Sequence, residues 1–147
     1  MWTMFRKEYR FLRYNRNKKM VLVSFILSAY YRSIIILLPK TVLQKHMGNR
    51  GEESPHELPI EYHRQVAKVS RVVNQICDKT PWESKCLVRA LTAQRILSWK
   101  KISSTLYLGV GKDGEKMIAH AWLRCGEYFV TGGSGSQYGM VAKFRKG

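Results

Sequence analysis

Two residues in the C-terminal half of this 147-residue chain have side chains suited to nucleophilic catalysis. Cys86 follows the stretch TPWESK, and His120 lies in the stretch AHAW. A thiolate attacks a carbonyl carbon, and an imidazole can take the thiol proton and later give it to a leaving amine. Cys86 and His120 are therefore a candidate nucleophile and general base, provided that the fold brings them together.

The segment before Cys86 has the signals of a helix start. Thr80 is a suitable N-cap, Pro81 suits the first helical position, and Glu83 completes a capping box. If the helix begins instead at Ser84, Cys86 lies in its first turn. There the helix dipole and the free N–H groups favour a thiolate and can hold an oxyanion. A buried, unreactive cysteine is the alternative.

His120 lies in the second of three predicted strands. After Lys101 the hydrophobic period changes to two, which predicts strands over residues 104–111, 116–125 and 128–133, with turns at KDGE and CGEY. A helix is predicted over Glu61–Asp78 from its apolar stripe. Helices followed by an antiparallel meander indicate an α+β fold. The tail TGGSGSQYG lacks the setting of a phosphate-binding loop and is predicted to be a flexible loop lining the cleft.

The N-terminal third is basic and apolar. Residues 1–19 place an aromatic and aliphatic stripe among cations, which suits a helix that packs on the protein, docks on a partner or lies on an anionic membrane. Residues 20–39 are nearly long enough to span a bilayer, but burying Arg32 mid-membrane costs at least roughly 2.5 kcal/mol. We therefore predict one long buried helix, or two, ending at Pro39. With residues 46–59 as a linker, the predicted parts are 1–58, an N-terminal helical region, and 59–147, the catalytic domain.

Composition limits the chemistry and the partners. The formal net charge of +16 favours acidic partners without choosing among them. Three cysteines without paired spacing indicate neither a disulfide framework nor a zinc site, so we expect no metal and no cofactor, and a reducing cytoplasm as the location. Of the three, Cys77 and Cys125 are expected to be structural.

Three motifs in order resemble the leader peptidases of lasso-peptide biosynthesis, a transglutaminase-like cysteine protease family of the microcin J processing type. They are Cys-Leu-x-Arg-Ala at Cys86, Leu-x-x-Gly-Val around 106–110 and Ala-His-Ala-Trp at 119–122. The resemblance covers roughly residues 60–135. It implies a transglutaminase-like, papain-like core in which a helix carrying the cysteine packs on a small sheet. It also implies a Cys–His–Asp peptidase that removes the leader from a ribosomally made precursor, with Cys86 as nucleophile and His120 as base.

At the position of the third catalytic residue, this sequence departs from the pattern of the family that it resembles. The position at which many relatives have an acid holds Gly132. A two-residue turn at Gly126–Glu127 would pair Trp122 with Thr131 and put Thr131 on the face of His120. Glu127 would lie about 20 Å along the strand from His120. Thr131, a backbone carbonyl or Gln137 is therefore the expected orienter of the imidazole, and a bare Cys–His dyad is the alternative.

The substrate and partners follow mainly from the resemblance. Trp82, Arg89 and Trp122 are the candidate substrate-binding residues, with core packing or surface pairing as their other roles. The implied partners are the precursor leader, a small leader-recognition protein and the ATP-dependent lasso cyclase. Nucleic acid is not expected, and peripheral membrane contact through the N-terminal region stays an open alternative. The alternatives are a basic, non-catalytic protein that binds nucleic acid or anionic membrane, and an acyl transferase using the same pair.

Overall fold

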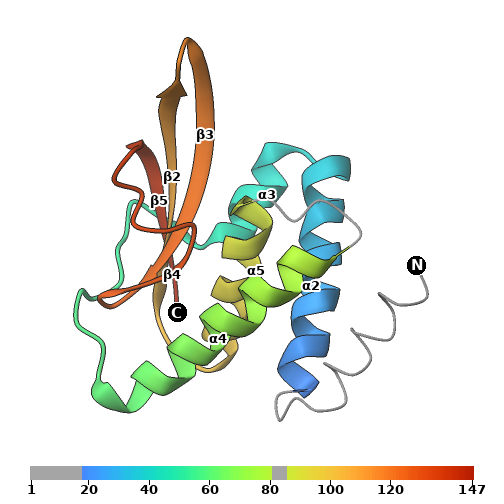
Figure 1. The fold of residues 1–147 in the computed structure, drawn as a ribbon, viewed down its shortest axis with the longest axis vertical. Coiled ribbons are helices and arrows are strands. Elements are labelled where there is room, and N and C mark those ends of the chain that lie inside the picture. Colours follow the sequence, from blue (N-terminus) through green and yellow to red (C-terminus); the bar gives the residue numbers. More distant parts are fainter. Residues whose placement is uncertain (1–17, 81–85) are drawn as a thin grey trace.

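The protein combines a layer of helices with an antiparallel sheet. The computed structural model describes residues 18–80 and 86–147, and this part of the chain has four helices and five strands (Figure 1). The helices are α2 (Lys18–Leu37), α3 (Lys40–Met47), α4 (Ile60–Lys79) and α5 (Cys86–Trp99). The strands are β1 (Asn49–Arg50), β2 (Ser104–Asp113), β3 (Lys116–Cys125), β4 (Tyr128–Thr131) and β5 (Gly139–Lys146).

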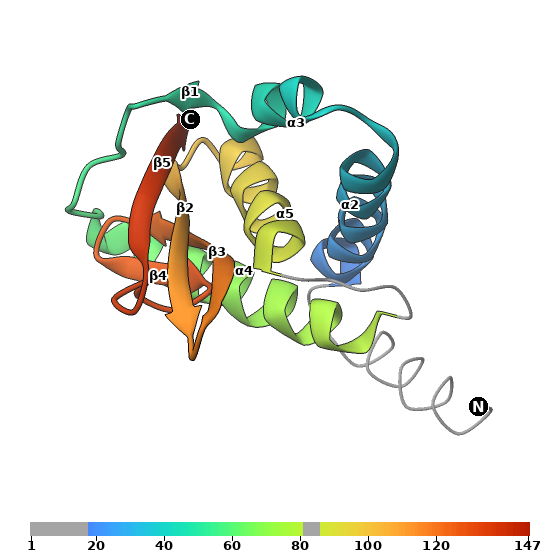
Figure 2. The same ribbon diagram turned by 90° about the horizontal axis from the view of Figure 1, so that it is seen from above.

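The helices cover one face of the sheet. Its strand order is β1-β5-β2-β3-β4, with every neighbouring pair antiparallel. Helix α5 packs on β2, β3 and β4, while α4 packs on β4 and α2 packs on both α4 and α5 (Figure 2). The α+β fold predicted from the sequence is therefore confirmed.

One hydrophobic core joins the N-terminal and C-terminal parts of the chain. Tyr31, Ile34 and Met47 belong to the same buried cluster as Val69 and Phe144. Strand β1 also pairs with β5 near the C-terminus. This core crosses the boundary predicted between residues 58 and 59. The expected long helix before Pro39 is confirmed as α2, and the helix expected from Glu61 is confirmed as α4.

The C-terminal tail contains a strand that the sequence analysis missed. Residues 139–146 form β5, which lies between β1 and β2 rather than beside β4. The chain must therefore cross over β3 and β2 to reach it. Residues 132–138, which we call the crossing loop, make this passage on the face turned away from α5 (Figure 2).

The crossing loop lies directly on an indole ring. A Cβ at Gly135 would overlap the ring of Trp122, and Gly135 has a φ of +68°. A Cβ at Gly109, on the neighbouring strand β2, would also come within 2.8 Å of the same ring. Glycine is required at Gly135 on two grounds, since its backbone is left-handed and a ring occupies the space of a side chain.

A bulge in β4 changes the predicted pairing of this hairpin. Cys125 pairs with Tyr128 as expected, but the register then shifts and Thr131 pairs with Leu123, not with Trp122. The carbonyl of the intervening Val130 accepts hydrogen bonds from two α4 side chains, at 2.7 Å from Ser70 Oγ and 3.1 Å from Asn74 Nδ2. These side chains hold the extra residue against α4, which explains the shift.

We predict that Gly135→Ala destabilises the fold more than Gly133→Ala. Both glycines are left-handed, with φ of +68° and +72°, but nothing lies within 4 Å of a Cβ at Gly133. The two variants share the backbone strain, and only Gly135→Ala adds an overpacking penalty of about 1–3 kcal/mol. Urea unfolding measures the difference. Equal losses in the two variants would contradict the close packing of the crossing loop on Trp122.

Candidate active site

Cys86 lies on the helix that packs against the strand of His120. It opens the described part of α5, and its side chain is half-buried and packs against the main core. Helix α5 in turn packs on β3. The predicted cap residues Pro81 and Glu83, together with the candidate substrate residue Trp82, lie outside the described residues.

The His120 ring is held by a backbone carbonyl. Its Nε2 lies 2.7 Å from the carbonyl oxygen of Gly132. A carbonyl oxygen can only accept a hydrogen bond, so Nε2 carries a proton, and in the neutral imidazole Nδ1 therefore keeps its lone pair. This is the protonation pattern that a general base needs, with Nδ1 as the atom that accepts a proton.

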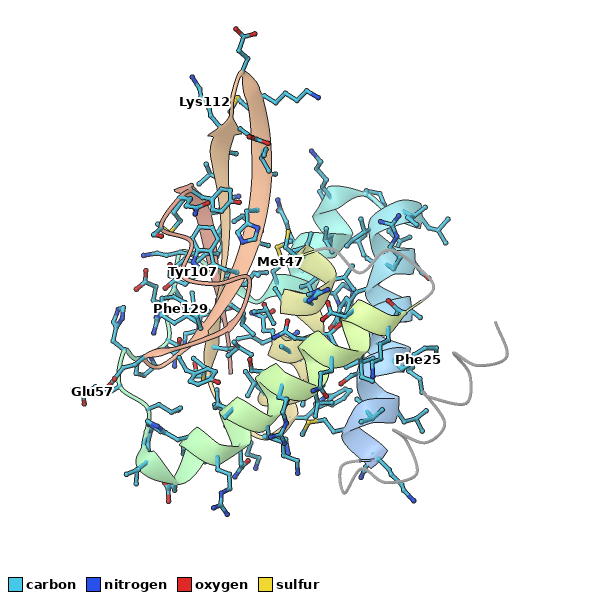
Figure 3. All side chains as sticks on the ribbon, viewed as in Figure 1. Phe25, Met47, Glu57, Tyr107, Lys112 and Phe129 are labelled. Atoms are coloured by element: carbon cyan, nitrogen blue, oxygen red, sulfur yellow. The ribbon has the colours of Figure 1, made fainter. Side chains whose placement is uncertain are left out.

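Aromatic rings fix the plane of the imidazole. The ring of Tyr138, at the end of the crossing loop, stacks on His120 with centroids 4.4 Å apart and planes 22° apart. Trp122 lies 6.0 Å away on the same face of β3 and stacks in turn on Tyr107 at 5.5 Å. Figure 3 shows Tyr107 on the side of the sheet turned away from the helices. The crossing loop therefore supplies both the hydrogen-bond acceptor and one stacking partner of His120.

Thr131 does not orient His120, contrary to its predicted role. The bulge in β4 pairs it with Leu123, whose side chain belongs to the core beside α5. Successive strand residues face opposite sides of a sheet, so Thr131 shares the face of Leu123 and not that of His120. Its hydroxyl is buried and has no hydrogen-bond partner within residues 18–80 and 86–147. Among the expected orienters, the structure has the backbone carbonyl, that of Gly132.

The other two candidate substrate residues are already engaged. Arg89 forms an ion pair with Asp78. Trp122 is only 5% exposed because the crossing loop covers its ring. Direct contact between Trp122 and a substrate therefore requires the crossing loop to lift. Their roles in binding stay predictions.

The two candidate catalytic side chains are not bonded to each other. No hydrogen bond between Cys86 and His120 occurs in the described part of the chain. Ala121 and Leu123 point from β3 into the core beside α5, whereas His120 and Trp122 stack on the opposite face. The fold thus packs the two elements together, while a catalytic contact between the side chains requires a change from this arrangement.

The other cysteines have the environment of core residues. Cys77 and Cys125 are both buried. The Cys125 thiol donates to the carbonyl of Ser103 at 3.3 Å, and burial raises its pKa to about 11. A thiol in this state is a poor nucleophile at neutral pH.

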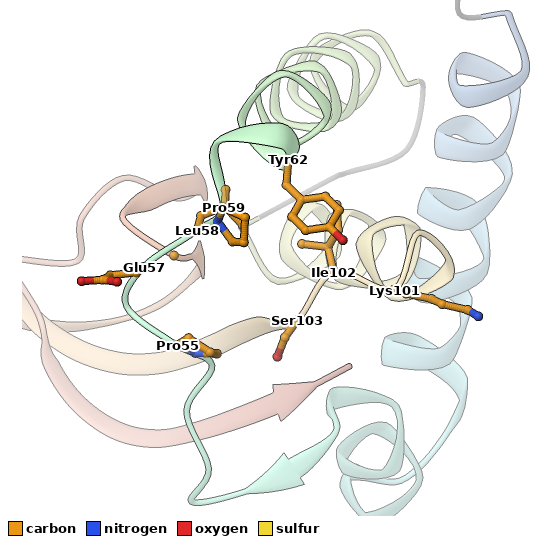
Figure 4. Close-up of a pocket in the computed structure, with 9 residues that line it drawn as sticks. Pro55, Glu57, Leu58, Pro59, Tyr62, Lys101, Ile102 and Ser103 are labelled. Atoms are coloured by element: carbon orange, nitrogen blue, oxygen red, sulfur yellow. The ribbon is translucent and has the colours of Figure 1, made fainter.

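A small pocket lies at another place in the fold. It has a volume of about 110 Å³ and lies between the linker, the start of α4 and the α5–β2 connection (Figure 4). Its lining includes Pro55, Leu58, Tyr62, Ile102 and Gly126. Neither Cys86 nor His120 lines it, so it is separate from the candidate site. Within the two described ranges, no group of three or more His, Cys, Asp or Glu side chains has the arrangement of a metal site.

Comparison with known families identifies the fold. A family model for the transglutaminase-like superfamily matches residues 35–145. This chain belongs to the transglutaminase-like superfamily. The superfamily includes cysteine proteases and acyltransferases, and the match contains Cys86, His120 and the crossing loop of this transglutaminase-like domain. No curated protein and no solved structure matches the chain.

Neither the role of Tyr138 nor strand β5 in the tail was predicted from the sequence. The segment GMVAKFRK alternates apolar and basic residues at Ala142, Lys143, Phe144 and Arg145, which is a strand signal. To predict this strand, the preceding glycine-rich segment has to be interpreted as an ordered connection between two strands and not as a flexible tail. The stacking of Tyr138 on His120 has no local signal, because it depends on the position of β5 in the sheet.

We predict that Cys86 is the thiol that reacts in the folded protein. It is half-buried, whereas Cys77 and Cys125 are buried. An aromatic disulfide reagent should modify one thiol per native chain, and Cys86→Ala should remove that reaction while the unfolded variant still shows its two remaining thiols. An unchanged native reaction in Cys86→Ala would mean that a core cysteine is exposed by motion.

Proposed function

We propose that this chain is a cytoplasmic cysteine peptidase that removes the leader from a lasso-peptide precursor. The observation that carries the proposal is the hydrogen bond from His120 Nε2–H to the Gly132 carbonyl, which leaves Nδ1 of the neutral imidazole as the base. Membership of a superfamily that includes cysteine proteases supports it. The motifs at Cys86, 106–110 and 119–122 support the finer assignment to leader removal.

The proposed reaction has two steps. His120 Nδ1 takes the thiol proton as Cys86 Sγ attacks the peptide carbonyl carbon, and a C–S bond forms. The C–N bond then breaks, and the amine leaves with the proton from Nδ1. In the second step, water gives a proton to Nδ1 and forms the new C–O bond. The C–S bond breaks, and the proton returns to the thiolate.

The edge of β3 beside His120 suits an extended peptide. Strand β4 pairs only with residues 123–125 of β3, while β3 continues to Lys116. Along residues 116–121 the described chain has no strand on that side. An extended peptide can add to such an edge through main-chain hydrogen bonds. We therefore infer that the leader segment next to the scissile bond pairs with this edge.

The missing acid has a chemical consequence. A carboxylate both orients an imidazole and stabilises the imidazolium, whereas the Gly132 carbonyl is a neutral acceptor. Because His120 also stacks on the face of β3 opposite α5, the chain is expected to need help in bringing His120 and Cys86 together. In the proposal this help comes from the bound precursor and a small leader-recognition protein, and the core peptide then passes to an ATP-dependent lasso cyclase.

The test is cleavage of the precursor, followed by mass spectrometry with the leader-recognition protein present. Cys86→Ala should abolish cleavage, and His120→Gln should slow it by about 10²–10⁴-fold. The matched control is His56→Gln, since His56 is an exposed histidine paired with Glu53 and should retain full activity.

Other products would reject the proposal. Cleavage that survives in Cys86→Ala contradicts the nucleophile. Transfer of the acyl group to an added amine, without hydrolysis, would make the chain an acyltransferase instead of a peptidase.

A further inference from the structure

One face of helix α2 carries large apolar side chains that are exposed. Leu22 and Ile26 are each 56% exposed, and Leu37 is 76% exposed. The exposed set is Leu22, Phe25, Ile26, Tyr30, Ile36 and Leu37. Their spacing of three, four and seven positions places them on one side of the helix, which we call the α2 apolar face. Figure 3 shows Phe25 on the side of α2 turned away from the sheet.

The opposite face of α2 is fixed to the protein. Val21, Ser24, Ser28, Tyr31 and Ile34 are buried, and α2 packs on α4 and α5. Arg95 Nε donates a hydrogen bond to the Tyr31 hydroxyl at 3.1 Å. By length and composition α2 is sufficient to cross a membrane, but 39% of its apolar window is buried inside the protein. A helix surrounded by lipid would have to give up these contacts, so a spanning arrangement conflicts with the fold.

Cations lie at both ends of the α2 apolar face. Lys18 and Lys19 lie exposed at one end of α2, and Lys40 lies exposed just beyond the other. Lys45 is also exposed and lies on α3 next to His46, whose ring is 5.9 Å from that of Tyr30. Between Lys18 and Arg50 the sequence contains no Asp or Glu. An apolar face with cations at both ends is complementary to the hydrocarbon boundary and the phosphates of an anionic bilayer.

We propose that α2 docks the protein on an anionic membrane surface. The helix lies in the plane of the interface, with the α2 apolar face in the acyl boundary and its other face on α4 and α5. The lysines at the two ends contact lipid phosphates, and Tyr30 lies at the headgroup level. This inference does not depend on the peptidase proposal, because neither Cys86 nor His120 takes part.

Vesicle co-sedimentation tests the docking surface. The full chain should bind vesicles of equal parts phosphatidylglycerol and phosphatidylcholine, bind phosphatidylcholine alone weakly, and lose binding as salt is raised. The double variant Ile26→Ser/Ile36→Ser should bind the anionic vesicles at least about tenfold more weakly. The double variant Ile60→Ser/Val141→Ser is the matched control, since these residues are 89% and 61% exposed on other elements.

Further measurements distinguish membrane binding through the α2 apolar face from other causes of vesicle association. Circular dichroism should show that both variants keep the fold, and Cys86→Ala should bind vesicles as well as the unaltered chain. Equal binding by the α2 variant and the control would overturn the proposal, since the net charge alone would then explain association. Loss of a dimer on gel filtration without loss of vesicle binding would assign the α2 apolar face to a second copy, and resistance to alkaline extraction would indicate a spanning helix.

Discussion

The hydrogen bond between His120 and the Gly132 carbonyl depends on the order of the strands in the sheet. Since β5 lies beyond β2 and not beside β4, the chain must cross the face of β3 and β2. Glycines allow the crossing loop to lie on the Trp122 ring, and the passage brings the Gly132 carbonyl to Nε2 of His120 and the Tyr138 ring onto a face of the same imidazole. The state of the candidate base is therefore a property of the topology, not of a residue beside it in the chain.

Replacing a carboxylate by a carbonyl changes what the site can do unaided. The Gly132 oxygen selects the Nε2–H form of His120 as a carboxylate would, but it adds no full negative charge. The same crossing loop covers Trp122 and stacks on His120. Any movement of this loop therefore acts on the Trp122 ring and on the imidazole together. The proposed need for a bound precursor and a partner follows from the missing charge and from the position of His120 on the face of β3 opposite α5.

The features predicted correctly from the sequence depend on interactions between residues that are close together in the chain. The apolar period gave α4 and the β2–β3 hairpin, and Gly126 with Glu127 gave the turn that pairs Cys125 with Tyr128. The prediction for Thr131 was wrong because Ser70 and Asn74, distant in sequence, bind the Val130 carbonyl and shift the register. The position of β5 was missed for a related reason, since pairing with β2 rather than with the preceding β4 is decided by the whole sheet.

The tautomer of the neutral His120 imidazole is the most direct test of the hydrogen bond to the Gly132 carbonyl. A two-bond ¹H–¹⁵N correlation spectrum distinguishes protonated from unprotonated ring nitrogens, and His120→Gln identifies the signals. We predict a protonated Nε2 and an unprotonated Nδ1 for the neutral His120 ring, with this preference lost when Tyr138→Ala loosens the crossing loop. A protonated Nδ1 in the unaltered protein would contradict it, because the Gly132 carbonyl would then not be the partner that sets the state of the base.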